Sequence, residues 1–130
     1  MQIGISLPTT KPDVADSWFL EWARRAEAGP FSSLGIIDRL AYVNYEPLVT
    51  LAAAAAVTQR IRLMSTIVIA PLRHAAILAK QAATLDALSG GRFTLGLGIG
   101  RREDDYQAAD ALFQTRGRRF EEQLALMKRI

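Results

Sequence analysis

Apolar and polar residues along the chain follow two periods in turn, the period of two that is typical of a strand and the period of about 3.6 that is typical of a helix. Short alternating runs bounded by Gly or Pro are separated by longer amphipathic runs. The short runs predict four strands, at Gln2–Leu7, Leu34–Asp38, Ile61–Ile69 and Phe93–Ile99. The third is almost continuously apolar, which favours a parallel strand that is buried on both faces.

The longer runs predict four helices, one after each strand. The first extends from about Asp13, as its N-cap residue, to Ala28, where a Gly-Pro pair stops it. The second opens at the sequence EPL and extends through five alanines to about Thr58. The third covers about Ala75–Leu88, and the fourth begins in RGRRFEEQLALMKRI.

Strict alternation of strands and helices predicts a parallel α/β sheet with right-handed crossovers. A closed (β/α)8 barrel needs eight strands and typically about 250 residues, whereas this chain of 130 residues predicts four strands. We therefore expect residues 1–130 to form a single α/β domain of the TIM-barrel type. It would consist of the first four strand–helix units, a half barrel.

The fourth predicted strand has one apolar face and one face that ends in Gly96, Gly98 and Gly100. Glycine weakens a strand and often marks the close approach of a ligand or of another backbone. The spacing G-x-G-x-G is neither a dinucleotide fingerprint nor a P-loop, because no third glycine stands at the required position and no Gly-Lys-Ser/Thr follows. The glycines by themselves therefore identify no ligand.

Charged residues gather where the predicted strands end, which is where ligands bind in parallel α/β folds. Asp38 is the one carboxylate that ends a strand. The cationic residues at the same edge are Arg39, Arg73, His74, Arg101 and Arg102. One interpretation is a cationic mouth for an anionic or phosphate-bearing ligand. The other is that the arginines pair with Glu103, Asp104 and Asp105 in a solvated loop, and the sequence leaves both open.

His74 is the only histidine, and the chain has no cysteine. A metal site or a Ser-His-Asp triad would have to be built around this residue alone, so neither is predicted. The favoured interpretation is a histidine in a loop or at a helix start. If it acts, it would donate a hydrogen bond to a ligand rather than serve as a base. Asp38 and His74 are the candidate catalytic residues.

The composition is typical of an ordered globular protein, since 50% of the residues are hydrophobic, 22% are charged and the net charge is +3. No run of Lys and Arg alternates with aromatic residues, so a nucleic-acid partner is not expected. The longest apolar stretch, around Leu51–Val57, is too short to span a membrane, and the N-terminus does not resemble a signal peptide. We expect a soluble cytoplasmic protein with a small-molecule substrate and no membrane partner.

Three segments carry a resemblance to a known family: EPLVTLAAAAAVTQRIRL, LAKQAATLDALSGGRFTLGLGIG and RGRRFEEQL. They resemble the N-terminal half of the luciferase-like flavin/deazaflavin-dependent oxidoreductase superfamily (bacterial luciferase-like monooxygenases). The resemblance implies a TIM barrel that binds reduced FMN or an 8-hydroxy-5-deazaflavin at its C-terminal mouth. It also implies a monooxygenase or oxidoreductase that acts on a small organic substrate.

The resemblance further implies which residues lie near the cofactor. These are Asp38 at the end of the second strand, Thr66 and Ile67 at a non-prolyl cis peptide bond, and Gly98, Ile99 and Gly100 on the bare strand face. On this view, the glycines leave room for a flat ring. The segment QAADALF lacks a glycine that the family often carries near Asp110.

The alternative to an oxidoreductase is a non-catalytic half-barrel fragment or oligomerisation module that lacks a complete cofactor site. Four parallel strands cannot close a barrel, so Gln2–Leu7 and Phe93–Ile99 would be open edges. The inner face, including Met64 and Val68 or their neighbours, would be open to water. We therefore expect a homodimer or higher homo-oligomer, formed either through these edges or through the second and third helices.

Overall fold

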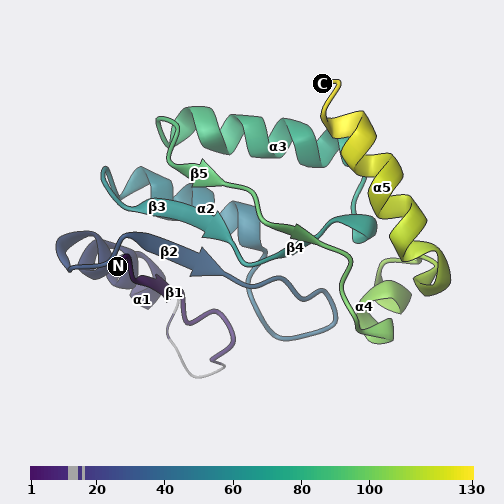
Figure 1. Cartoon of the computed structure of the whole chain (residues 1–130). Coiled ribbons are helices and arrows are strands. Elements are labelled where there is room, and N and C mark those ends of the chain that lie inside the picture. Colours follow the sequence, from purple (N-terminus) through teal and green to yellow (C-terminus); the bar gives the residue numbers. More distant parts are fainter. Residues whose placement is uncertain (12–14, 16) are drawn as a thin grey trace.

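The computed structural model describes residues 1–11, 15 and 17–130, and it is an α/β fold built on parallel strands (Figure 1). Asp13, the expected N-cap of the first helix, lies outside the described residues. The strands are β1 (Gly4–Ser6), β2 (Ser33–Ile36), β3 (Arg62–Ser65), β4 (Val68–Ile69), β5 (Phe93–Thr94) and β6 (Leu97–Gly98). The helices are α1 (Ser17–Ala28), α2 (Pro47–Ala56), α3 (Ala75–Leu88), α4 (Glu103–Ala108) and α5 (Arg116–Met127).

The strands form one parallel sheet of order β1-β2-β3-β5 and a parallel pair, β4-β6. Sequential strand order and parallel pairing confirm the predicted alternation of strands and helices. Short 3-10 turns, η1 (Ala70–Leu72) and η2 (Phe113–Thr115), precede α3 and α5. In Figure 1, α4 and α5 gather beyond the ends of β4 and β6. That these strands are the first half of an eight-stranded barrel stays a prediction.

The third and fourth predicted strands are each interrupted, and the two interruptions lie next to each other. The third splits into β3 and β4 around the Thr66–Ile67 peptide bond, which is cis as expected. The fourth splits into β5 and β6 before Gly96, whose N–H donates to the Ser65 hydroxyl at 2.9 Å while that hydroxyl donates to the Gly96 carbonyl at 2.9 Å. A side-chain hydroxyl thus replaces part of the backbone ladder, which period-two patterning does not reveal.

The register gives the sheet two chemically different faces. One row across the four strands is Ile5, Leu34, Leu63 and Phe93, which packs in the core beneath the helices. The adjacent row on the opposite face is Ser6, Gly35, Met64 and Thr94. The second face is therefore mostly small and polar, with Met64 as its one large apolar side chain in this row.

The expectation that Val68 would be open to water is wrong, because its side chain is fully buried in the core cluster. Met64 is half-buried on the sheet face that lies opposite the helices. Since the hydrophobic driving force scales with exposed apolar area, a face of Ser, Gly and Thr loses little when it is hydrated. Among the described residues, no helix is both long and apolar enough to cross a bilayer.

Arg92, just before β5, ties the ends of two helices to the sheet. Its Nε donates to the Ser89 carbonyl at 2.7 Å, after the end of α3. Its Nη1 donates to the Ile61 carbonyl at 2.9 Å, and its Nη2 donates to the Thr58 carbonyl at 2.9 Å and the Ala55 carbonyl at 3.3 Å, at the end of α2. The last carbonyls of a helix lack intrahelical partners, so this guanidinium satisfies groups that would otherwise be unpaired.

We predict that Arg92→Ala lowers the free energy of unfolding by about 2–3 kcal/mol, because part-buried carbonyls lose charge-assisted hydrogen bonds. Urea unfolding followed by circular dichroism measures the change. Arg118→Ala is the control, since Arg118 forms an exposed pair with Glu122 at 3.7 Å, and such pairs contribute about 0–1 kcal/mol. Equal effects of the two substitutions would contradict the role assigned to Arg92.

Candidate functional site

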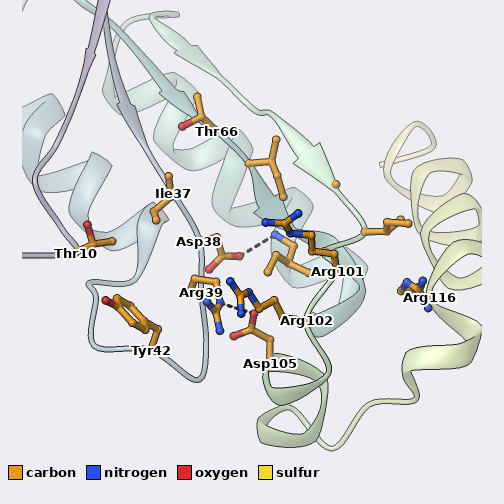
Figure 2. A pocket seen from close by; sticks show the side chains of 15 residues that line it. Thr10, Ile37, Asp38, Arg39, Tyr42, Thr66, Arg101, Arg102, Asp105 and Arg116 are labelled. Atoms are coloured by element: carbon orange, nitrogen blue, oxygen red, sulfur yellow. Dashed lines mark hydrogen bonds and ion pairs between the residues drawn. The ribbon is translucent and has the colours of Figure 1, made fainter.

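An open cleft of about 870 Å³ lies at the carboxyl ends of the strands, the edge where the sequence predicts ligand binding. Its walls come from the ends of β2, β4 and β6, from the loops that follow β1 and β2, and from the starts of α4 and α5 (Figure 2). The lining residues are Thr10, Ile37, Asp38, Arg39, Tyr42, Thr66, Ile67, Ile69, Gly98, Ile99, Gly100, Arg101, Arg102, Asp105 and Arg116.

The wall of the cleft between the strand ends is apolar. Ile37, Ile67 and Ile99 are each more than a third exposed, although they belong to the ends of strands, where apolar side chains are usually covered. Three exposed isoleucines on one concave surface mark a surface that is suited to an apolar ligand.

The glycine face is filled by the neighbouring strand. A Cβ atom at Gly98 would lie 2.9 Å from Ile67 Cδ1, and one at Gly100 would lie 2.8 Å from Ile69 Cγ2. At Gly96, a Cβ atom would overlap the Ser65 carbonyl oxygen. The glycines thus allow the segment from Ser65 to Ile69 to approach closely. Gly98 and Gly100 also line the cleft, and their role in binding a cofactor stays a prediction.

Asp38 is buried beneath the cleft, and both of its oxygens accept hydrogen bonds. Oδ2 accepts from the Ile69 backbone N–H at 2.8 Å and from Arg73 Nη1, and Oδ1 accepts from Arg73 Nη2 at 3.0 Å. Arg73 also donates to Glu46 at 3.2 Å. Burial alone would lower the pKa of Arg73, but Asp38 and Glu46 hold this pKa above its ordinary value. This geometry gives Asp38 a positioning role, and its candidacy as a catalytic residue stays a prediction.

A second buried carboxylate, Asp105, holds the loop that follows β2. Its Oδ1 accepts from the backbone N–H groups of Leu40 at 2.7 Å and Ala41 at 2.8 Å. Its Oδ2 accepts from Arg39 Nε at 2.7 Å, and Arg39 Nη2 donates to the exposed Asp104 at 2.8 Å. Burial would raise the pKa of Asp105, but the two amides and the guanidinium hold this pKa below its ordinary value.

Helix α4 fixes the position of the last strand end. The buried Tyr106 hydroxyl donates to the Ile99 carbonyl, and burial raises the pKa of this phenol, so that the donor stays protonated. The Tyr106 ring meets the Phe113 ring edge-on at 5.2 Å. The guanidinium group of Arg116 lies over the Phe113 ring, with its carbon 3.7 Å from the ring centroid. These contacts place Ile99 and Arg116 on the cleft.

The arginines at this edge divide between the two interpretations that the sequence leaves open. Arg39 forms ion pairs with Asp104 and Asp105, as the loop-pairing interpretation predicts. Arg73 instead pairs with Asp38 and Glu46, which that interpretation does not include. Arg101 and Arg102 line the cleft, are exposed, and form no ion pair with any acidic residue in the described part of the chain. Together with Arg116, which also lines the cleft and forms no ion pair within the described residues, these are the cations that an anionic ligand could meet.

The predicted site residues are largely brought together. Asp38, Thr66, Ile67, Gly98, Ile99 and Gly100 all line the cleft. His74 does not; it is exposed at the N-cap of α3 and makes no capping hydrogen bond with its side chain, which agrees with the helix-start interpretation.

Sequence reasoning missed Thr10, Tyr42, Arg116 and helix α4 as parts of this edge. The acidic run Glu103–Asp105 was the available signal for α4, because acidic residues favour the first turn of a helix. Tyr42 and Arg116 come from loops and from a distant helix, where residue periodicity carries no information about a site.

We predict that wild-type stability exceeds that of Asp105→Asn at neutral pH and that the difference shrinks as the pH falls below about 4. The folded-state pKa of Asp105 is lowered, so its contribution is complete above the unfolded-state pKa and is lost as the pH falls through the folded-state value. Unfolding free energies of both proteins between about pH 2.5 and 7 measure the effect. A difference that does not depend on pH would contradict it.

The comparisons with known proteins agree with this geometry. Residues 1–130 match the family model of the luciferase-like monooxygenases. An uncharacterized protein of Mycobacterium tuberculosis is 31% identical over 134 residues, which cover 86% of this chain and 46% of that protein. The chain therefore spans about half the length of the curated relatives that it matches over most of its length.

Two solved structures are similar in both fold and sequence. The monooxygenase RslO1 from Streptomyces bottropensis superposes with a TM-score of 0.89 at 31% identity, covering 99% of this chain and 42% of that one. The coenzyme F420-dependent tetrahydromethanopterin reductase from Methanopyrus kandleri gives a TM-score of 0.70 at 31% identity, covering 86% and 30%. With the family model matched from the first residue to the last, this chain belongs to the luciferase-like monooxygenase family.

Proposed function

We propose that the cleft binds a reduced flavin-type cofactor, either FMN or 8-hydroxy-5-deazaflavin, and that the protein is an oxidoreductase or monooxygenase acting on a small organic substrate. The observation that carries this proposal is the union in one cleft of an apolar wall with two unpaired arginines. FMN and coenzyme F420, which is built on an 8-hydroxy-5-deazaflavin, both combine a flat tricyclic ring with an anionic tail, so the apolar wall matches the ring and the arginines match the tail.

The residues present fit such a group. Ile67 and Ile99 offer apolar surface to a ring. At Gly98, between them, no side chain projects from the cleft wall. Arg101 and Arg102 offer guanidinium groups to a phosphate, which they can bind through paired N–H donors. The cofactor supplies the hydride or oxygen chemistry when bound, while the chain binds it, orients it and excludes water.

The similar proteins support the class of cofactor but leave the choice open. One similar structure at 31% identity is a monooxygenase, and another at 31% identity is a coenzyme F420-dependent reductase. Coenzyme F420 is thus named for one similar protein, and FMN is bound in a Baeyer-Villiger monooxygenase of the same fold at 23% identity, so both cofactor types occur among proteins of this fold. Separate titrations with FMN and with coenzyme F420 decide between them.

A homodimer or higher homo-oligomer remains our proposal for the assembly, and the groove between α2 and α3 supports the second of the two expected contacts, the one through these helices. This groove of about 280 Å³ is lined mainly by apolar side chains. Val49, Ile77 and Leu88 along it are 68%, 58% and 71% exposed. Light scattering tests the proposal, since a species of about 14 kDa at micromolar concentration would contradict it.

We predict that Arg101→Ala and Arg102→Ala each weaken FMN binding by about tenfold or more, because each removes a charge-assisted contact to the phosphate. Riboflavin has the same ring without the phosphate, so that its affinity should not change. Quenching of flavin fluorescence measures both affinities. Arg25→Ala on α1, where the arginine pairs only with Glu21, is the control for the loss of a positive charge.

An equal loss of affinity for FMN and riboflavin would show that the two arginines do not hold the phosphate. Failure of FMN and of coenzyme F420 to bind the wild-type protein would leave the alternative, a non-catalytic half-barrel fragment or oligomerisation module. A visible-absorbance spectrum of the purified protein gives the first indication, because bound flavin absorbs in the blue.

We also predict that Gly98→Ala weakens flavin binding several-fold with little effect on stability. The added methyl group must displace the flexible end of Ile67, which then moves into the cleft. Gly117→Ala on α5 is the matched control, since nothing lies within 4 Å of its added methyl group. Flavin affinity equal to that of the wild type in Gly98→Ala would show that the glycine serves strand packing alone.

A further inference from the structure

A second cavity lies at the opposite edge of the sheet from the cleft. It has a volume of about 330 Å³ and is lined by residues at the amino ends of the strands. In Figure 1, β2, β3 and β5 run toward α4, so that their amino ends lie on the side of the molecule away from the cleft. The polar lining residues are Gln2, Ser32, Ser33, Arg60, Arg62 and Arg92.

Among the described residues, three arginines and no carboxylate line this cavity. Arg60, Arg62 and Arg92 form no ion pair with any acidic side chain in the described part of the chain. Glu27 interacts with the charge of Arg60, but it is not part of the lining, and its carboxylate already accepts hydrogen bonds from the backbone amides of residues 59–61. The positive charge of the lining therefore has no carboxylate partner within the cavity.

Two of these arginines are held in place by backbone carbonyls. Arg60 donates from Nη1 to the Phe31 carbonyl at 3.0 Å. Its Nη2 donates to the carbonyls of Glu27 at 2.5 Å and Gly29 at 3.1 Å. Arg92 donates to carbonyls at the ends of α2 and α3. Carbonyl oxygens satisfy the N–H donors without cancelling the charge, so both residues supply a fixed positive field, which a concave surface focuses.

Arg62, at the start of β3, is the arginine whose guanidinium remains available to a ligand. It is exposed, and its one hydrogen bond within the described residues runs from Nη1 to the Thr94 hydroxyl at 3.0 Å. This bond holds the side chain along the sheet, while Nε and Nη2 keep their N–H donors. Two parallel N–H donors on one edge of a guanidinium match two oxygens of a phosphate group.

The neighbours of Arg62 on the same face of the sheet complete the lining. Ser33 of β2 is its partner in the register, and the Ser33 hydroxyl makes no hydrogen bond within the described residues. A Cβ atom at Gly4, the next position in this row, would overlap the Ser33 hydroxyl, so the missing side chain gives that hydroxyl its room. Met64, which is half-buried, adds apolar surface to the cavity.

We propose that this cavity at the amino ends of the strands is a second binding site, that it takes a phosphate group, and that Arg62 is the side chain that binds it. Arg60 and Arg92 contribute fixed positive charge, and Ser33 contributes a hydroxyl donor. The phosphate is either free or carried by a small organic ester, whose organic part would contact Met64. The inference does not rest on the proposed function, because no described residue lines both the cleft and this cavity.

Titration of inorganic phosphate into the isotopically labelled protein tests the site, with chloride used to keep the ionic strength constant. Backbone amide shifts locate the binding, and the Nε–H resonance of Arg62 reports direct contact. We expect saturable shifts at residues 32–33 and 60–64 and at this Nε–H group. A second titration with phenyl phosphate distinguishes the two forms of the ligand. Tighter binding than that of inorganic phosphate assigns an ester, and equal binding assigns free phosphate.

Variants then test the assigned residues. Arg62→Gln should weaken phosphate binding at residues 60–64 by about tenfold or more, because it removes the charge and the paired donors. Arg62→Lys should restore part of the affinity, because an ammonium group keeps the charge without the fork of donors. Thr94→Val should weaken binding several-fold, because it removes the hydroxyl that holds Arg62. Arg24→Gln is the matched control, since Arg24 is exposed on α1 and lines neither cavity.

The outcomes separate this inference from the proposed function. Phosphate shifts that are absent at residues 60–64, or confined to residues 98–102 of the cleft, would overturn the inference alone. Unchanged affinity in Arg62→Gln, or an equal loss in Arg24→Gln, would also overturn it, because the attraction would then be a property of the net charge. Phosphate binding at residues 60–64 without any binding of FMN or coenzyme F420 would overturn the proposed function and leave the second site supported.

Discussion

The buried ion pair between Asp38 and Arg73 is the interaction on which the arrangement of the cleft depends. It joins the end of β2 to the turn that follows β4, and through Glu46 it reaches the start of α2. The Arg73 carbonyl also accepts a hydrogen bond from the buried Gln123 of α5 at 2.7 Å. Breaking one partner of such a pair costs about 3–5 kcal/mol, because it leaves the other charge buried and unpaired. The pair therefore fixes geometry more than it adds net stability.

Asp105 forms a second buried ion pair, with Arg39, and this pair holds the other side of the β2–α2 loop. Two buried carboxylates thus pair with Arg39 and Arg73, and the arginines of the cleft lining that form no ion pair within the described residues are Arg101, Arg102 and Arg116. This division leaves unpaired positive charge on the cleft, which favours an anionic group of a ligand.

The sequence was sufficient for the parallel order, for four of the five α-helices in the described residues and for the edge at which the site lies, because these follow from periodicity and from the rules for parallel sheets. It was insufficient for the ion pairs. Arg39 and Asp105 are 66 residues apart, and which arginine finds a carboxylate depends on distances that the fold sets. The cis bond at Thr66–Ile67 was expected through the family resemblance and not from the residues themselves. The interruption beside Ser65 and Gly96 depends on a hydroxyl that reaches across to the neighbouring strand, for which no sequence pattern exists.

The glycines of the last strand connect packing to the cleft. Their missing side chains are matched by bulk on the neighbouring strand: the Ser65 carbonyl at Gly96, Ile67 at Gly98 and Ile69 at Gly100. Because β6 has no side chain at Gly98, Ile67 leans across it and remains 36% exposed on the cleft. A larger residue at Gly98 would displace the Ile67 side chain. The close packing of the two strands and the shape of the apolar wall therefore depend on the same glycine. The bare strand face is thus room for the neighbouring strand, and by admitting that strand it also shapes the surface that a ligand would meet.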